Sequence, residues 1–276
     1  MSDLTEWIST DDLTLITAEE RRWLEDVFDR FAGYPDLEQM WSLMDDVWKS
    51  IGCDPMVMDA RTSAFYSHPV WLLNGLFIEQ HKESLENREQ YKNWVVQQAP
   101  LRVAEFGGGF GGLARMIGAS LPETFVEVIE PHPHPLAIAR AERTSNVSYR
   151  HEMCGKYDVI IATDVFEHVL DPLQMVYKTA QYLHVGGKYL IANCFYPVIL
   201  CHLPQTFHFR HTWDVVMKVM GLEPAEKISY GRAFIRKGDL KLGDARQVEQ
   251  QSLTLWRYTQ YLPDKLARLF TRMLIY

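Results

Sequence analysis

Cysteine, positive charge and long hydrophobic runs are all scarce in this chain of 276 residues. Its four cysteines stand at irregular spacing, which does not fit a disulfide framework and favours a reducing cytoplasm. Lysine and arginine total 28 against 36 aspartates and glutamates, a net charge of −8 that argues against a nucleic-acid partner, because phosphate backbones require a basic face. The richest apolar run, residues 189–201, is too short to span a bilayer, which needs about 20 apolar residues. We therefore expect a cytoplasmic protein without a membrane or nucleic-acid partner.

The charges that are present are unevenly spread along the chain. Residues 1–60 hold fifteen acidic against four basic side chains, a net charge of −11, whereas residues 239–276 have a net charge of +2. A shift of this kind indicates separate elements at the two ends. The length allows one large core with additions. We expect a helical, substrate-covering cap over residues 1–98, a core over residues 99–238 and a helical extension over residues 239–276.

The N-terminal region carries the signals of several helices. Thr17 and Glu20 stand at the spacing of a capping box, in which each side chain hydrogen-bonds to the backbone amide of the other residue. Apolar residues at helical spacing follow this pair. Pro35 is placed to open a second helix. Apolar residues over 70–78 then lead into a further helix over 84–98.

Five tryptophans of this region are candidates for a binding site: Trp23, Trp41, Trp48, Trp71 and Trp94. Their rings could form an aromatic cage around a flat substrate. We favour the alternative, that they fill the core of a helical cap, because large aromatic side chains are mostly buried in folded proteins.

Beyond residue 99 the pattern changes to alternating strands and helices. It predicts strands over 101–106, 124–130, 147–150, 157–163 and 188–195, and helices over 111–120, 135–143, 172–184 and 212–221. The span 223–237 predicts a closing antiparallel pair with its turn near Tyr230 and Gly231. Alternation of this kind gives a parallel sheet with helices on both faces, and ligands bind outside the carboxyl ends of its strands. Residues 255–276 predict one amphipathic helix that packs on the domain or on a second copy of the chain.

Glycines and carboxylates gather where these strands end. The first strand runs into Glu105-Phe-Gly107-Gly-Gly109-Phe-Gly111-Gly112. The strand over 157–163 runs into Asp164-Val-Phe-Glu167-His168-Val, and the last parallel strand is preceded by Leu183-His-Val-Gly186-Gly187. Glycines at alternate positions leave the backbone bare, so that a ligand can approach it closely. A ligand site at this edge of the sheet is therefore expected.

Taken together, these segments resemble the class I S-adenosylmethionine (SAM) methyltransferases, in particular the small-molecule branch that includes the ubiquinone- and menaquinone-biosynthesis enzymes. The resemblance covers residues 99–238. It implies an α/β fold with a seven-stranded Rossmann-like sheet, S-adenosyl-L-methionine as cofactor, and methyl transfer to a small-molecule acceptor, most often to a hydroxyl group.

The glycine loop by itself has a second interpretation. Gly107-x-Gly109-x-x-Gly112 also satisfies the dinucleotide-binding fingerprint, and Glu130 lies about where a ribose-binding carboxylate would stand. An NAD(P)-dependent oxidoreductase is therefore the alternative. Glu105 favours SAM, because a carboxylate at that point attracts a cationic methionine group and repels a pyrophosphate. A non-catalytic SAM-binding protein is a further alternative, which the retained His168 argues against.

The resemblance also implies roles for single residues in holding the cofactor. The backbone of Gly107, Gly109 and Gly111 lines the methionine part of SAM, with Glu105 near its amino group. Glu130, at the end of the second strand, accepts hydrogen bonds from both ribose hydroxyls.

The adenine and sulfonium sides are less closely specified by the motifs. Glu152 or a backbone group binds the adenine amino group, and Met153 forms an apolar wall. Asp164 either faces the sulfonium side of the pocket or caps the helix that follows it.

Histidines are the candidate catalytic bases for a hydroxyl acceptor. His168 stands just after the fourth strand, where the family often has a functional histidine. His202 and His208 lie in the loop after the fifth strand, which should hang over the acceptor. His202 and His208, with Cys201 and His211, could also be metal ligands, but their spacing matches no standard zinc pattern, and we expect no metal. A histidine base predicts a rate that rises with pH near 6 to 7.

Overall fold

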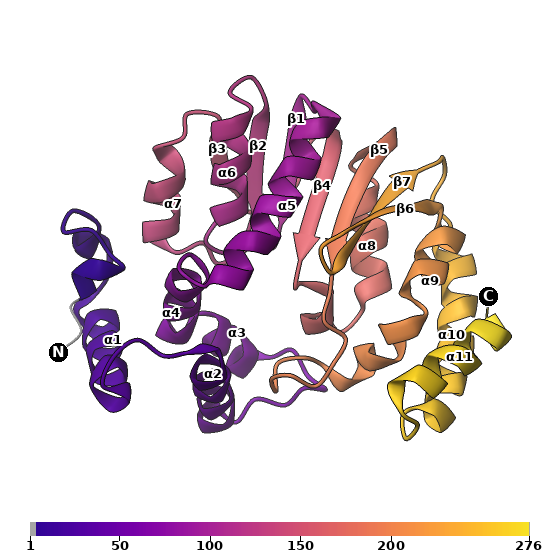
Figure 1. The fold of residues 1–276 in the computed structure, drawn as a ribbon, viewed down its shortest axis with the longest axis horizontal. Coiled ribbons are helices and arrows are strands. Elements are labelled where there is room, and N and C mark those ends of the chain that lie inside the picture. Colours follow the sequence, from indigo (N-terminus) through magenta and orange to yellow (C-terminus); the bar gives the residue numbers. More distant parts are fainter. Residues whose placement is uncertain (1–3, 276) are drawn as a thin grey trace.

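The computed structural model describes residues 4–275 and contains a seven-stranded sheet with the strand order β3-β2-β1-β4-β5-β7-β6 (Figure 1). The strands are β1 Arg102–Phe106, β2 Phe125–Ile129, β3 Val147–Arg150, β4 Tyr157–Thr163, β5 Leu183–Ala192, β6 Leu222–Ile228 and β7 Gly231–Arg236. Strands β1 to β5 pair in parallel, whereas β7 runs antiparallel between β5 and β6. The predicted α/β fold class and the closing antiparallel pair are confirmed.

Helices cover both faces of this sheet. Because successive residues of a strand point to opposite sides, each central strand packs against both layers of helices. Val103 and Val159 pack with the helices α5 Lys82–Gln98, α6 Gly112–Ser120 and α7 Pro135–Glu142. Ala104 and Ile160 pack with α8 Pro172–Ala180, α9 Trp213–Met220 and α10 Leu242–Thr259. Burial on both faces explains why β1 and β4 are nearly continuous apolar runs. Their polar residues are therefore confined to the strand ends, where the site lies.

The junction between α8 and β5 differs from the prediction. Helix α8 ends at Ala180 rather than at residue 184, and β5 begins at Leu183 rather than at residue 188. Leu183 pairs with Tyr157 of β4 and is fully buried, so tertiary pairing overrides the helical pattern that extends to this point. Gly186, with a φ of 84°, lies in the left-handed region and accommodates the register shift of this pairing.

The N-terminal helices gather at the carboxyl ends of the parallel strands (Figure 1). They are η1 Leu4–Glu6, η2 Asp12–Leu15, α1 Ala18–Phe31, α2 Leu37–Ile51, α3 Ala60–Tyr66 and α4 Pro69–Ile78. The predicted capping box opens α1: Thr17 Oγ1 accepts from Glu20 N at 3.1 Å, and Thr17 N donates to Glu20 Oε2 at 2.7 Å. The prediction that Pro35 opens the second helix is wrong, because Asp36 forms the N-cap of α2 through its carboxylate.

Ion pairs fasten this cap to the helices of the sheet. Asp12 of η2 pairs with Arg140 of α7 and with Arg143 just beyond it. Glu79, which follows α4, pairs with Arg115 of α6 and again with Arg140. Because a buried carboxylate is stable only when it is paired, these contacts hold η2 and α4 against the sheet on the side of the glycine loop.

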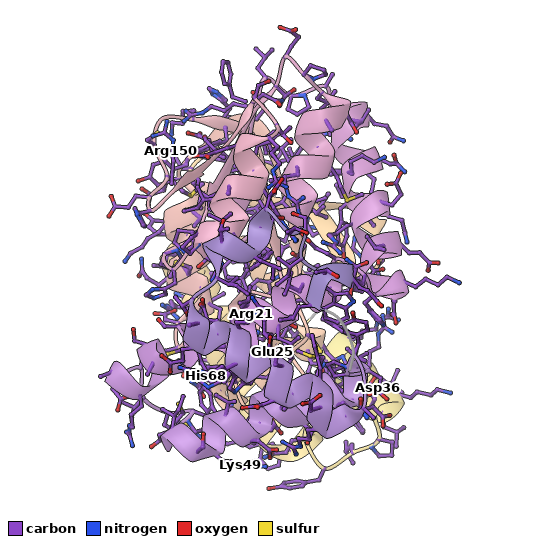
Figure 2. The ribbon with its side chains drawn as sticks, turned by 90° about the vertical axis from the view of Figure 1, so that its left-hand side faces the viewer. Arg21, Glu25, Asp36, Lys49, His68 and Arg150 are labelled. Atoms are coloured by element: carbon purple, nitrogen blue, oxygen red, sulfur yellow. The ribbon has the colours of Figure 1, made fainter. Side chains whose placement is uncertain are left out.

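The cap has a polar outer side and an aromatic inner side. Figure 2 shows Arg21 and Glu25 on α1, which form an ion pair at 2.9 Å and are about half exposed. Trp48 is 3% exposed and packs edge-on against Phe65, and Trp94 of α5 packs against the sheet. Trp48 therefore fills the core of the cap, as the interpretation that we favoured requires, whereas Trp94 belongs to the core between the sheet and its helices.

The C-terminal extension consists of α10 and α11 Asp264–Ile275 rather than of one helix over residues 255–276. The helix is interrupted at residues 260–263, where Pro263 lacks the amide hydrogen that a continuing helix needs. Residue 276 lies outside the described residues. Within residues 4–275, none of the helices combines the length and the apolar character that crossing a membrane requires. Two short helices, η3 Phe166–His168 and η4 Pro204–His211, complete the fold.

Candidate functional site

The glycine-rich loop joins the carboxyl end of β1 to the start of α6. Gly107, Gly109 and Gly111 have φ values of 69°, 50° and 63°, in the left-handed region that favours glycine. A Cβ added to Gly107 would lie 2.6 Å from Val165 Cγ2, so the loop is pressed against the core at this point. A Cβ added to Gly109 would meet no atom of the described residues within 4 Å. The loop therefore presents bare backbone to open space, where a ligand can approach.

Glu130 follows β2 and reaches across to this loop. Its Oε2 accepts a hydrogen bond from Gly109 N at 3.0 Å, and its Oε1 accepts one from His132 N at 3.1 Å. Each carboxylate oxygen can accept a further hydrogen bond, as the two hydroxyls of a ribose would require. The structure thus brings together two features that lie 21 residues apart in the chain.

Glu105 is buried at the end of β1, with 4% of its surface exposed. Its Oε2 accepts a hydrogen bond from Ala114 N, in the first turn of α6, at 2.9 Å. Loss of hydration raises the pKa of Glu105 to about 7, although the bond from Ala114 and the nearby charges of Arg88 and Arg115 act in the opposite direction. A cation placed beside this carboxyl group would favour its ionised form, which suits the ammonium of a methionine moiety.

The loop after β3 holds the two residues predicted for the adenine side. Glu152 is exposed, and Met153 is half-buried against the core between the sheet and α8. A residue that the sequence reasoning missed lies nearby: Tyr149 of β3 donates its hydroxyl hydrogen to Gly109 O at 2.9 Å. Tyr149 therefore ties β3 to the glycine loop, a contact that no local motif signals.

Asp164 ends β4 with a φ of 52°, a left-handed conformation that residues other than glycine adopt rarely and often at functional sites. It accepts a hydrogen bond from Tyr230 Oη at 2.7 Å. The alternative role as a helix cap does not agree with the structure. Val165 occupies the N-cap position of η3, and Asp171 caps α8.

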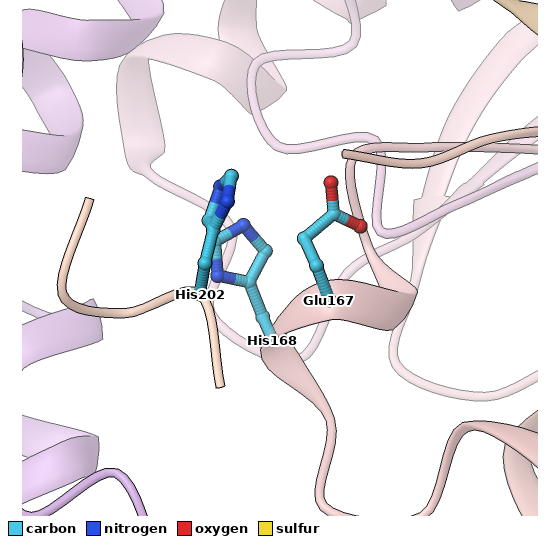
Figure 3. Close-up of side chains that lie close together, drawn as sticks. All are labelled: Glu167, His168 and His202. Atoms are coloured by element: carbon cyan, nitrogen blue, oxygen red, sulfur yellow. The ribbon is translucent and has the colours of Figure 1, made fainter. Parts of the chain in front are cut away.

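Glu167, His168 and His202 come together at the carboxyl ends of β4 and β5 (Figure 3). One nitrogen or carboxylate oxygen of each lies within 4.8 Å of those of the other two. His168 Nδ1 is 2.9 Å from Cys201 O, and His202 Nδ1 is 2.7 Å from Tyr196 O. Because a carbonyl oxygen only accepts, each Nδ1 carries the hydrogen, and each Nε2 is left with a lone pair.

Burial controls the charge of this cluster. Loss of hydration, with a smaller contribution from His202, lowers the pKa of His168 to about 3. Loss of hydration and the nearby charge of Asp164 raise the pKa of Glu167 well above its usual range. Among the described residues, Glu167 Oε2 has no hydrogen-bond partner. The predicted rise in rate near pH 6 to 7 therefore does not apply to His168, whose imidazole is neutral throughout that range.

Two neutral imidazoles beside a carboxyl group can accept protons, and the same donor set can coordinate a divalent cation. The cap adds two aromatic residues to this place. The rings of Tyr66 and Trp71 lie 6.5 and 6.4 Å from the ring of His168. Their polar atoms, Tyr66 Oη and Trp71 Nε1, are buried without a hydrogen-bond partner in the described part of the chain. Buried polar groups of this kind mark a place where a polar ligand would be satisfied.

A cleft of about 300 Å³ opens beside His168. Its walls include Met58 of the cap, Leu170 and Asp171 of the loop after η3, and Met175 of α8. The cleft therefore lies between the cap and the sheet domain, next to α8. Trp71 was one of the five tryptophans considered as an aromatic cage and set aside in favour of a core role. The sequence offered no signal for Met58 or Tyr66, because nothing local separates them from ordinary core residues.

The structure does not bring His208 into this cluster. His208 Nδ1 lies 3.0 Å from Ser252 Oγ of α10, and Ser252 Oγ also donates to His208 O at 2.9 Å. Loss of hydration lowers the pKa of His208 to about 4. Its contacts join η4 to α10 and so hold the loop that carries His202.

The topology and the family comparison now decide between the two interpretations of the glycine loop. In the dinucleotide-binding fold all six strands are parallel, in the order 3-2-1-4-5-6. Here β7 is antiparallel and inserted between β5 and β6. Residues 104–189 match the model of a family described as a methyltransferase domain. The chain carries a methyltransferase domain. Its fold is class I, its methyl donor is S-adenosyl-L-methionine, and the oxidoreductase alternative is not favoured.

Solved structures with the same fold agree with this assignment. An O-methyltransferase family protein from Burkholderia thailandensis is 13% identical, with coverage of 73% of this chain and 70% of that one, at a TM-score of 0.54. A protein named PigF, solved with SAH, is 11% identical over 78% and 73% of the two chains, at a TM-score of 0.51. A putative O-methyltransferase from Nostoc punctiforme is 14% identical over 72% and 71%, at a TM-score of 0.50. At these identities the likeness shows the fold alone. A search of curated proteins found no match to the chain.

Proposed function

We propose that this methyltransferase transfers the methyl group of SAM to a hydroxyl group of a small molecule, with His168 as the general base. The observation that carries the proposal is the hydrogen bond from His168 Nδ1 to Cys201 O, which leaves Nε2 with a lone pair in a residue that lines the cleft. Two structural neighbours, an O-methyltransferase family protein and a putative O-methyltransferase, support the choice of a hydroxyl acceptor.

The chain's own residues account for the proton. SAM supplies an electrophilic methyl group, which is displaced in line from a sulfonium that becomes a neutral thioether. His168 Nε2 takes the hydroxyl proton as the acceptor oxygen forms its bond to the methyl carbon. Because the raised pKa of Glu167 keeps the proton on that carboxyl group, the charge that the imidazole gains would be stabilised by the hydrogen bond from His168 Nδ1 to Cys201 O. His202 offers a second lone pair and would hold the acceptor or share the role of base.

The residues around the glycine loop, at the carboxyl ends of the strands, have the chemistry that binding of SAM requires. Bare backbone at Gly107, Gly109 and Gly111 would lie along the methionine part, with Glu105 near its ammonium and Glu130 on the ribose. The remaining assignments are Glu152 or a backbone group for the adenine amino group, Met153 for the adenine wall and Asp164 for the sulfonium side. Residues 99–238 would thus bind the cofactor.

Residues 1–98 would cover the acceptor. The unpaired polar atoms of Tyr66 and Trp71 support this role, because they are buried next to His168 and come from the cap. The cleft between Met58 and α8 would be the path by which the acceptor enters. Its apolar wall at Met58, Leu170 and Met175 suits a ring or chain that carries the reactive hydroxyl at one end.

The location and the partners of the chain are further parts of this proposal. All four cysteines are free, which supports a reducing cytoplasm. Exposed apolar residues of α11 support a second copy of the chain as the partner of residues 239–276, rather than a membrane or nucleic acid. The lining of the cleft supports a small-molecule acceptor.

The test of the base is substitution of single histidines. His168→Ala should lower the turnover number about a hundredfold to ten-thousandfold, because general-base loss has this effect, and should leave SAM affinity unchanged. His184→Ala, at an exposed position near the start of β5 and so at the opposite end of that strand from the cluster, is the matched control and should keep its turnover. Turnover of the native chain should be flat from pH 6 to 7, since the pKa of His168 is lowered to about 3 and the base is already neutral there. Transfer of labelled methyl groups to hydroxylated small molecules would measure these rates.

A metal control separates the two uses of the cluster. Treatment with EDTA should leave turnover intact if Glu167, His168 and His202 act without a metal. Loss of turnover that Mg²⁺ or Zn²⁺ restores would instead make these residues metal ligands and would contradict the base assignment. Native turnover in His168→Ala would also contradict it and would favour methyl transfer by alignment alone.

A further inference from the structure

A tyrosine from the β6–β7 turn reaches the edge of the sheet where the cofactor binds. Tyr230 Oη donates to Asp164 Oδ2 at 2.7 Å, although 66 residues separate the two in the chain. The topology makes this contact available. Strand β6 runs antiparallel to β7 and therefore in the direction of β4, so that the turn after β6 lies at the carboxyl end of β4.

The turn that carries Tyr230 is held rigidly. Ser229 Oγ donates to Asn87 Oδ1 of α5 at 2.6 Å, and the Tyr230 ring packs edge-on against buried Tyr91 with ring centres 6.0 Å apart. Ser229, with a φ of 51°, and Asp164, with a φ of 52°, are both left-handed. Ser229 belongs to the two-residue turn and lies next to Tyr230, whereas Asp164 itself accepts the hydrogen bond, so the backbone on each side of this bond is fixed in an uncommon conformation.

The carboxyl group of Asp164 lies beside two groups that both favour its ionised form, Tyr230 and Glu167. Loss of hydration raises the pKa of Asp164 even though part of the residue is exposed, and the hydrogen bond from Tyr230 acts against this rise. Glu167 of η3 is the neighbouring acid, and its pKa is raised further by Asp164. Two adjacent carboxyl groups do not both ionise readily. Because Tyr230 donates to Asp164 and not to Glu167, its hydroxyl adds to the preference for the negative charge on Asp164 and the proton on Glu167.

We propose that Tyr230 is a positioning residue that holds Asp164 ionised at the sulfonium side of the cofactor site and thereby raises the affinity for SAM relative to S-adenosylhomocysteine. The proposal rests on the placement of Asp164 in the proposed function. The two ligands differ by one positive charge, which the transfer reaction removes. A fixed carboxylate near that charge strengthens the binding of the donor and not that of the product, so it favours exchange of product for fresh donor.

Binding measurements test this without an acceptor. Tyr230→Phe keeps the ring against Tyr91 and removes only the hydroxyl, and Ser229→Ala removes the other hydroxyl of the same turn, which contacts Asn87 instead. Calorimetry at pH 7 should show SAM binding about tenfold weaker in Tyr230→Phe with S-adenosylhomocysteine binding unchanged. Ser229→Ala should keep the native ratio of the two affinities.

Two further variants make the mechanism specific. Asp164→Asn should show the same selective loss, and the double variant should lose no more than Asp164→Asn alone, because the hydroxyl acts only through that carboxylate. As the pH is lowered, the affinity for SAM should also begin to fall at a higher pH in Tyr230→Phe than in the native chain, because Asp164 is protonated more readily without the hydroxyl. Equal weakening of both ligands in Tyr230→Phe, or additive loss in the double variant, would overturn the proposal. Because these binding measurements need no acceptor, a negative result would not bear on the role of His168 as base. Native turnover in His168→Ala would likewise not bear on the role of Tyr230.

Discussion

Glu130 is the residue on which the ribose of the cofactor should depend most. Its carboxylate already joins the glycine loop through Gly109 N, so the ribose would complete a preformed acceptor rather than order a mobile one. Glu130→Ala removes both acceptors and should weaken SAM by about 1–3 kcal/mol, or about tenfold to a hundredfold in Kd. Calorimetry with SAM and with NAD would measure this.

The control for this prediction is Glu226→Ala, which removes an exposed carboxylate of β6 and the same unit of charge. It should bind SAM as the native chain does, so that any loss in Glu130→Ala reflects the contact and not the net charge. Unchanged SAM affinity in Glu130→Ala would remove the ribose assignment. Binding of NAD by the native chain would revive the oxidoreductase interpretation.

At the scale of elements, the contact between η4 and α10 determines where the His202 loop lies. Ser252 of α10 is buried and contacts three atoms of η4 and its end: His208 Nδ1, His208 O and Thr212 Oγ1, at 2.8 to 3.0 Å. Ser252→Ala leaves buried polar atoms of His208 and Thr212 without this partner. The free energy of unfolding should fall by about 1–3 kcal/mol. Chemical denaturation followed by circular dichroism would measure it.

A matched variant on the same helix isolates this effect. Thr254→Ala removes an exposed hydroxyl that bonds only to the carbonyl of Gln250 within α10, and should change the unfolding free energy by a few tenths of a kcal/mol. SAM affinity should be native in both variants, because the glycine loop lies at the other side of the site. Equal stability of the two variants would show that the Ser252 network does not secure η4.

At the scale of the whole molecule, α11 leaves an apolar face without a cover in the described chain. Its exposed side chains are Leu266, Leu269, Phe270, Met273 and Leu274. Burial of such a face in a homodimer gains about 25 cal/mol for each Å² of apolar surface. We expect the native chain to sediment as a dimer at micromolar concentration, and Leu269→Ser combined with Met273→Ser to sediment as a monomer.

The polar side of the same helix supplies the control. Lys265→Ser combined with Arg272→Ser changes two exposed positions of α11 and should leave the dimer intact. A native chain that sediments as a monomer at every concentration would contradict the proposed second copy. A native dimer that persists in the Leu269 and Met273 variant would place the interface elsewhere.

The strands and the glycine loop could be predicted because their determinants are local. Residues such as Val103 and Ile160 are apolar in short runs that both faces of a parallel sheet require, and Glu105 and Glu130 stand directly at the ends of those runs. Where the determinant was not local the prediction failed. Leu183 is a strand residue only because Tyr157 pairs with it, and the break at residue 260 separates two helices of similar composition.

The class of the protein could be inferred from its motifs, because strand ends followed by glycines and carboxylates can be recognised without a fold in hand. How the site is completed depends on the packing of distant segments. This packing placed His202 beside His168, kept His208 on α10, and carried Tyr230 to Asp164. It also set the charges, since the pKa of His168 falls to about 3 through burial that no sequence pattern records. Contacts between distant segments and loss of hydration are properties of the packed chain, and for that reason they could not be inferred residue by residue.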